Sequence, residues 1–246
     1  VLLAVAAAAC VPQRYEERPL DPERSAGEWS ELRLDAPALA EFARANGRAD
    51  FPPASWDLDA LTLAAFFFQH ELGAARAELE QARAAVLSAG ARPNPTLALD
   101  PEVVPGAASP WILGWKLDIT VETAGKRGLR VDAAEQDVRT RELELYATAW
   151  RVRSRLAAAW AELGAALRER DTLVEERALR EQRRALLDRR LEAGRSARAE
   201  LVHEELELQR AAGELEAADT RLVATRAGLA AALGVPLEAL DGLLLV

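Results

Sequence analysis

Glu200, His203 and Glu207 are the residues whose types and spacing come nearest to metal-binding chemistry. Residues three and four positions apart share one face of a helix, so these two carboxylates and one imidazole would point the same way. Carboxylate oxygens and imidazole nitrogens are ligands for zinc and related metals. On an exposed helix, however, this combination is usually surface charge, and His70 stands alone as a structural residue. We therefore predict no metal site.

The sequence also contains no recognisable catalytic motif. It has no Gly-rich phosphate loop, no Cys/His cluster and no credible Ser-His-Asp arrangement. Catalysis requires a positioned nucleophile or acid–base pair in a pocket. We expect a protein that is not an enzyme, with no catalytic residue and no cofactor.

Composition indicates long helices and argues against binding to nucleic acid. The chain has 246 residues and a formal net charge of −9, and half of its residues are hydrophobic. Non-specific binding to nucleic acid needs clustered cations opposite phosphates, which an acidic chain does not favour. Ala, Leu, Glu and Arg dominate, as they do in long helices.

The N-terminal residues resemble the end of an export signal. The segment 1–9 is apolar, ends in small residues and precedes Cys10, the one cysteine of the chain. We read residues 1–10 as a partial signal peptide of a chain truncated at its start. Cys10 is then a candidate for lipidation, and ordinary signal cleavage nearby is the alternative. No segment approaches the roughly 18 consecutive apolar residues of a membrane helix, so a membrane crossing would need strands.

Residues 11–55 form a polar N-terminal leader interrupted by prolines. Asp35 is a plausible N-cap for a short helix that ends near Gly47. We expect the rest of the leader to be extended or irregular.

Residues 56–246 form one repeat of helix, strand, strand, helix and helix. The first helix is predicted over 57–90, where Asp57 can cap its start and Pro93 and Pro95 prevent its continuation. The second runs over 125–193, which is roughly 100 Å at 1.5 Å per residue. The third runs over 197–233. Gly194 joins the last two into an antiparallel hairpin.

Both of the later helices carry a seven-residue repeat, which is typical of coiled coils. The first stripe consists of Val131, Val138, Leu145, Val152, Ala159, Ala166 and Leu173. The second consists of Leu201, Leu208, Leu215, Leu222 and Leu229, with Ala211, Ala218 and Ala232 three residues after three of these leucines.

Two strands are predicted over 96–104 and 111–122, joined by a short loop that makes them antiparallel. From Trp115 onward the second strand alternates without error, and alternate strand residues point to opposite faces. Its length and its terminal tryptophan suit a strand of an outer-membrane barrel, with apolar residues toward lipid and polar residues toward the pore. A half-buried strand of a soluble sheet is the alternative. The lipid-facing residues would be Trp115, Leu117, Ile119 and Val121, and the pore-facing residues would be Lys116, Asp118, Thr120 and Glu122.

Four segments of this chain resemble the TolC family of outer-membrane efflux channels, especially its heavy-metal-efflux branch. Segments 89–97 and 121–127, the latter with the sequence Val-Glu-Thr-Ala-Gly-Lys-Arg, are similar to the family's junctions between helices and strands. Segments 190–201 and 230–234 are similar to its periplasmic turn and to the end of its returning helix. The order and spacing fit, and the resemblance covers roughly residues 57–240. The signature at residues 122–127 is the most specific part.

The resemblance implies a mainly α fold with a β-hairpin. Long coiled-coil helical hairpins would form an α-barrel, and the two strands would join a membrane β-barrel. The family assembles as a homotrimer whose protomers each carry two such repeats. This chain holds one repeat, so we expect a truncated sequence, with a six-copy assembly of a half-length protein as the alternative. The resemblance further implies the outer membrane of a Gram-negative bacterium, with a large periplasmic part.

In the family a periplasmic adaptor and an inner-membrane RND-type pump dock below the channel. The resemblance therefore makes Gly194, Arg195 and Ser196 the candidate adaptor-docking tip. A turn that merely needs glycine for a left-handed backbone is the alternative. Lys126 and Arg127 are expected to be solvated or structurally paired.

These inferences favour the outer-membrane channel of a tripartite efflux system, which exports substrates passively from periplasm to medium. Export of heavy-metal ions rests on the resemblance of the signature alone. A periplasmic adaptor is one alternative, but its flanking lipoyl-like β segments are not recognisable here. A structural coiled-coil protein without transport is another, and it has no need of the alternating strand.

Overall fold

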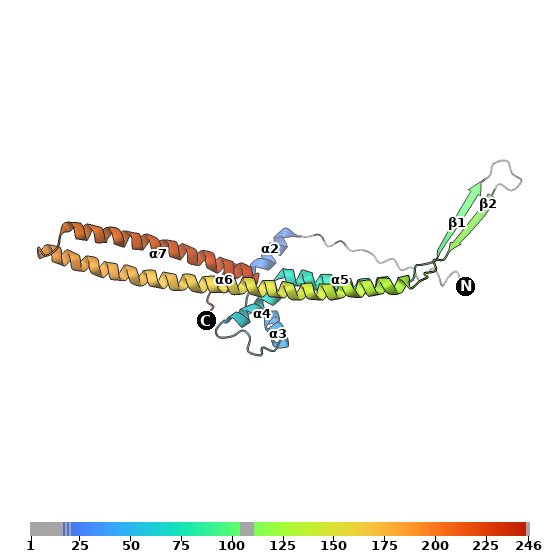
Figure 1. The fold of residues 1–246 in the computed structure, drawn as a ribbon, viewed down its shortest axis with the longest axis horizontal. Helices are drawn as coiled ribbons and strands as arrows, with labels where there is room; N and C mark the ends of the chain where they lie inside the picture. The colour runs from blue at the N-terminus through green and yellow to red at the C-terminus, as the bar shows by residue number, and fades with distance from the viewer. Residues whose placement is uncertain (1–16, 18, 20, 104–110, 245–246) are drawn as a thin grey trace.

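The computed structural model describes residues 17, 19, 21–103 and 111–244, which form an elongated rod (Figure 1). Helix α6 (Lys126–Glu192) runs along the rod and is about 100 Å long at 1.5 Å per residue. A β-hairpin of β1 (Thr96–Val103) and β2 (Trp111–Asp118) lies beyond one end of α6. The turn into α7 (Arg198–Leu233) lies at the other end. None of the described helices combines the length and hydrophobicity needed to cross a membrane.

Two helices divide the length of α6 between them. Helix α7 packs on the half that leads to the turn, and α5 (His70–Gly90) packs on the half that leads to the hairpin (Figure 1). All positions of both predicted seven-residue stripes are buried or half-buried. Helices α6 and α7 begin and end within one residue of the ranges predicted from sequence. The long apolar stripes therefore specify how these helices pack.

The prediction of one helix over residues 57–90 is wrong at Gln69. The structure has α4 (Leu58–Phe68) and α5 instead, with Gln69 extended between them at φ −70° and ψ 112°. The Gln69 side chain donates from Nε2 to the carbonyl oxygens of Ala231 at 3.0 Å and Ala232 at 2.8 Å. These carbonyls belong to the last turn of α7, where no further helical amide is available to them. The break thus places a side-chain donor at the end of another helix.

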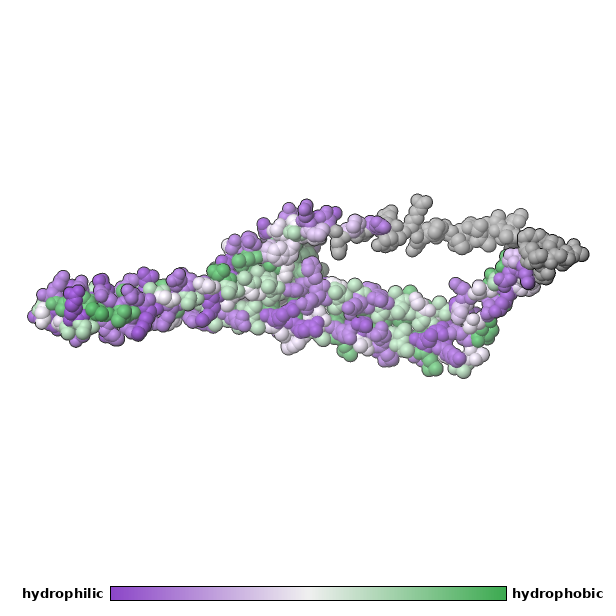
Figure 2. Space-filling model, turned by 90° about the horizontal axis from the view of Figure 1, so that it is seen from above, coloured by the Kyte–Doolittle hydropathy of each residue, from purple (hydrophilic) through white to green (hydrophobic). Residues whose placement is uncertain are grey.

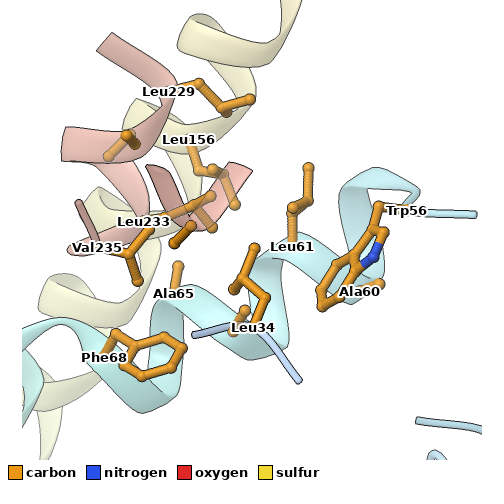
Figure 3. Packing of buried hydrophobic residues seen from close by; sticks show 14 of the residues in the cluster. Leu34, Trp56, Ala60, Leu61, Ala65, Phe68, Leu156, Leu229, Leu233 and Val235 are labelled. Atoms are coloured by element: carbon orange, nitrogen blue, oxygen red, sulfur yellow. The ribbon is translucent and has the colours of Figure 1, made fainter. Parts of the chain in front are cut away.

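The main hydrophobic core lies at mid-length, where α4, α6 and α7 meet (Figure 3). Leu61, Leu156, Leu229 and Leu233 are fully buried there. The N-terminal leader also contributes, through residues that include Leu34, Leu39, Phe51 and Trp56. The leader is therefore an integral part of the core.

The leader contains more helix than the sequence analysis expected. Helix α3 (Pro37–Ala45) lies within the predicted short helix, but α2 (Pro22–Ser30) was predicted as irregular. Asp21 accepts a hydrogen bond from the Arg24 backbone N–H and caps α2, and Pro22 stands at its first position. Asp followed by Pro is a recognisable helix start. The leader's many prolines led to the wrong prediction.

Candidate functional site

The β-hairpin has one apolar and one polar face. Its antiparallel register sets Leu97 opposite Leu117 and Leu99 opposite Trp115. Directly opposed residues lie on the same face of a sheet. The apolar face therefore combines Leu97, Leu99, Pro101, Leu113, Trp115 and Leu117. The opposite face combines Thr96, Ala98, Asp100, Gly114, Lys116 and Asp118.

The apolar face of the hairpin lies open. Leu113 is 71% exposed and Trp115 is 69% exposed, and the described helices do not pack on either strand. Exposed apolar surface of this kind is unfavourable in water by about 25 cal/mol per Å². Such a face is typical of a surface that contacts lipid or another protein. The hairpin thus requires an apolar surrounding that the described part of the chain does not provide.

Strand β2 ends at Asp118, four residues before the predicted end at Glu122. Its partner β1 begins at Thr96, directly opposite Asp118. Pro93 and Pro95 precede β1 and have no backbone N–H to extend the ladder. The predicted site residues Ile119, Thr120, Val121 and Glu122 therefore lie in the irregular segment between β2 and α6. Ile119 and Val121 are nevertheless 58% and 77% exposed.

An ion pair connects this segment to the helices. Arg130 donates from both of its terminal nitrogens to the Glu122 carboxylate, and from Nη2 to the backbone oxygen of Ala89 at 3.3 Å. Ala89 lies near the end of α5 and Arg130 near the start of α6. This contact, which no sequence motif indicates, joins the base of the hairpin to both helices.

A Schellman turn joins α6 to α7 at the far end of the rod. Gly194 has φ +69°, the Arg195 N–H donates to the Arg190 carbonyl at 2.8 Å, and the Gly194 N–H donates to the Leu191 carbonyl at 2.9 Å. Gly194 and Arg195 are exposed, whereas the Ser196 hydroxyl is buried with no hydrogen-bond partner among the described residues. The backbone conformation of the turn requires glycine, and two of its three predicted docking residues are accessible.

Near this turn lies a charged cluster that the sequence analysis missed. The Glu204 side chain is 2% exposed, and its Oε2 lies 3.1 Å from Arg183 Nε and its Oε1 3.7 Å from Arg180 Nη1. Arg180 also pairs with Glu176 and Glu207, and its hydrogen bond to Glu176 raises the pKa of Arg180 above its ordinary value. This cluster makes the α6–α7 contact near the turn ionic.

A simple signal would have revealed Glu204. It follows Leu201 by three residues, as Ala211 follows Leu208, so it occupies the alanine stripe of α7. Glu207, one member of the candidate metal trio, is paired with Arg180 and Arg210. The described residues contain no group of three His, Cys, Asp or Glu residues that could hold a metal ion.

No protein-family model and no curated protein matches the chain. Solved structures do match. The outer membrane protein VceC from Vibrio cholerae is 21% identical, with a TM-score of 0.65 over 76% of this chain and 49% of that chain. CusC, whose structures concern transmembrane channel formation, is 16% identical, with a TM-score of 0.64 over 73% and 44%. The CmeC outer membrane channel of Campylobacter jejuni is 14% identical, with a TM-score of 0.61 over 93% and 50%.

These similarities establish the fold. The chain spans about half the length of the channel structures it matches. Half of the length is what one of two repeats would cover. The mainly α fold with a β-hairpin is therefore confirmed: long helices in the arrangement of outer-membrane channels, with a two-stranded antiparallel sheet. The membrane β-barrel stays a prediction.

We expect Arg180→Ala combined with Arg183→Ala to destabilise the protein more than Glu204→Leu does. Loss of both arginines leaves a buried carboxylate unpaired, which costs at most about 3–5 kcal/mol. Leucine at position 204 removes that charge, and both arginines can then turn toward water. Thermal unfolding followed by circular dichroism compares the variants.

Arg184→Ala is the matched control for this comparison, because the Arg184–Glu205 pair is exposed, with side chains 45% and 41% accessible. Exposed pairs contribute about 0–1 kcal/mol, so the control should unfold close to the wild-type temperature. Equal losses in the double arginine variant and in Glu204→Leu would contradict the assigned role of the buried carboxylate.

Proposed function

We propose, on the premise that the chain has the fold of TolC-family outer-membrane channels, that it is part of a channel that conducts substrates passively out of the periplasm. The observation that carries the proposal is the two-faced hairpin at the end of a helical rod. In this proposal the strands lie in the outer membrane and the rod extends through the periplasm. No chemical step is needed, because the active work of export would belong to a pump.

The hairpin supports the proposed division between lipid and pore. Trp115 and Leu117 share their face with Leu99 and Leu97, so the proposed lipid-facing surface extends across both strands. Lys116 and Asp118 lie on the other face, with Nζ and Oδ2 4.0 Å apart. We assign Ile119 and Val121 to lipid and Thr120 and Glu122 to the pore as continuations of this pattern.

A two-stranded sheet has two unpaired edges, and unsatisfied backbone groups cost several kcal/mol each in lipid. Further strands must therefore satisfy them in the proposed channel. We propose that these come from other repeats and other protomers, in a homotrimer of the full-length protein that closes a membrane β-barrel.

Exposed apolar side chains on α6 favour a contact with a neighbouring helix in the proposed assembly. Leu143, Tyr146 and Trp150 are 67–72% exposed. Their spacing of three and four residues places them on one face of the helix. Figure 2 shows other hydrophobic side chains gathered at mid-length and near both ends of the rod. We propose that such surfaces pack against neighbouring helices and extend the barrel as an α-helical tunnel.

The proposed partners are a periplasmic adaptor and an inner-membrane RND-type pump, with the adaptor bound at Gly194, Arg195 and Ser196. An adaptor function for the chain itself is less well supported. Adaptors flank their helical hairpin with lipoyl-like β segments, and the described residues form only the strands β1 and β2. Lipidation of Cys10 remains a prediction, because Cys10 lies outside the described residues.

Adjacent labels on β2 test the membrane assignment. In a Cys10→Ser background, we expect a fluorophore on Leu117→Cys to be quenched by lipid-borne quenchers in proteoliposomes. A fluorophore on Lys116→Cys should instead be quenched by aqueous iodide, because neighbouring strand residues point to opposite faces. The two sites are one residue apart and serve as matched controls. Equal quenching of both labels by iodide would contradict a lipid-facing strand.

The proposed docking tip is tested by Gly194→Leu combined with Arg195→Glu. Leucine in the left-handed conformation costs about 1–2 kcal/mol, and the second change reverses an exposed charge. We expect cross-linking to the adaptor and export activity to fall at least several-fold while membrane insertion is retained. Arg76→Glu, an exposed arginine on α5, is the control. Unchanged cross-linking would refute docking at this turn.

We propose heavy-metal ions as the exported substrate, which is the most specific part of the proposal. Deletion of the gene should raise cellular copper or zinc and increase sensitivity to the same metal, measured by elemental analysis and growth. If the deletion strain became sensitive to organic drugs and its metal content did not change, metal export would be refuted and drugs would be the substrate class.

A further inference from the structure

A cationic cavity lies where the helices meet the strands. It has a volume of about 710 Å³, and its lining includes Arg92, Ile119, Val121, Glu122 and Arg127. Arg92 follows α5, Ile119 and Val121 follow β2, and Arg127 lies in the first turn of α6. Residues of both connections, from α5 to β1 and from β2 to α6, therefore line the cavity.

The charge of this cavity is positive. Arg92, Arg127 and the neighbouring Lys126 are exposed, and none of them forms an ion pair with another described residue. The one carboxylate in the lining, Glu122, is already paired with Arg130. The N-terminus of α6, at Lys126, adds the positive end of a helix dipole. The cavity thus favours an anion and offers no free carboxylate to a cationic group.

Apolar side chains border the same cavity. Ile119 and Val121 are exposed and continue the apolar alternation of Trp115 and Leu117 toward α6. A site lined by cations and by exposed apolar side chains matches a molecule that has a phosphate group and hydrocarbon chains. Basic pockets at a membrane surface recognise anionic lipid head groups in this way.

We infer that this cavity binds the phosphate head group of an anionic phospholipid. Arg92 and Arg127 bind the phosphate oxygens, and the acyl chains lie along Val121, Ile119 and the apolar face of the hairpin. The bound lipid fixes the depth of the hairpin in the bilayer. This inference rests on the proposed function, because it requires the hairpin to lie in a membrane.

The test uses protein expressed from the full reading frame and purified in detergent. Native mass spectrometry measures retention of phosphatidylglycerol, with phosphatidylcholine and inorganic phosphate as comparison ligands. We expect retention of phosphatidylglycerol to exceed that of phosphatidylcholine and to fall roughly 30-fold in Arg92→Ala/Arg127→Ala, at about 1 kcal/mol per cationic side chain. Arg76→Ala/Arg198→Ala removes the same charge from exposed sites on α5 and α7 and should retain the lipid.

Equal lipid retention in the two double variants would overturn the inference, as would a wild-type protein with no preference for phosphatidylglycerol. Displacement of the lipid by millimolar phosphate would also overturn it, because the site would then be a simple anion site. Flotation of wild-type proteoliposomes tests the proposed function separately. Wild-type protein that does not float with vesicles would refute the membrane location itself, whatever the lipid measurements show.

Discussion

The continuous apolar seam of α6 is the constraint on which the rest of the structure depends. Two different helices cover its apolar face, α7 along one half and α5 along the other. The two partners meet at mid-length, where α7 ends at Leu233, just before Gly234, and α5 begins after Gln69. A Cβ atom at Gly234 would lie 3.3 Å from the Phe68 carbonyl oxygen and the Gln69 side chain, so glycine permits this close approach. This close approach at Gly234 lets α7 and α5 together cover α6 over almost its whole length.

The two ends of the rod have opposite chemistry. The hairpin end presents an apolar face that lacks any described partner, whereas the turn end has ion pairs on and between α6 and α7. Between the two ends, α4, α6 and α7 meet in one hydrophobic core at mid-length. A surface suited to lipid is kept about 100 Å from a surface suited to an aqueous partner.

Local patterns predicted much of this fold, and tertiary contacts account for most of the differences. The seven-residue stripes specified α6 and α7, because a helix of that length must bury a regular face. The break at Gln69 was not predictable from periodicity, because buried residues such as Ala65, Phe68 and Leu72 keep helical spacing across it. At the break, the Gln69 side chain hydrogen-bonds to two carbonyls of α7, more than 160 residues away.

The candidate site shows the same limit. Alternation in β2 was visible in the sequence, and the register to β1 showed that Leu97 and Leu99 extend the same apolar face. The early end of β2 follows from Pro93 and Pro95, which precede the opposite strand, so predicting it requires the register as well as the residues. The partner of Glu122 also lay outside the motifs, because Arg130 comes from the second turn of α6. Both features depend on contacts between two segments of the chain, so neither can be predicted from one segment alone.

Side-chain size along α7 determines where the helical rod separates most easily. At mid-length its buried residues include Leu229 and Leu233, and toward the turn they are Ala218, Ala211, Glu204 and Leu201. Each buried methylene contributes about 0.8 kcal/mol, so the seam loses apolar stabilisation with every such replacement. The exposed ion pairs that accompany it, such as Arg170–Asp219 at 2.8 Å, contribute about 0–1 kcal/mol each and set the register more than the strength.

Segments with little buried apolar area open at the lowest free energy. In the proposed channel, the turn end is also the end at which a partner docks and a pore must widen. Separation of α6 from α7 there leaves the mid-length core, and with it the position of the hairpin, unchanged. In that proposal, opening at the turn would move the end that binds a partner and leave the core that positions the hairpin intact.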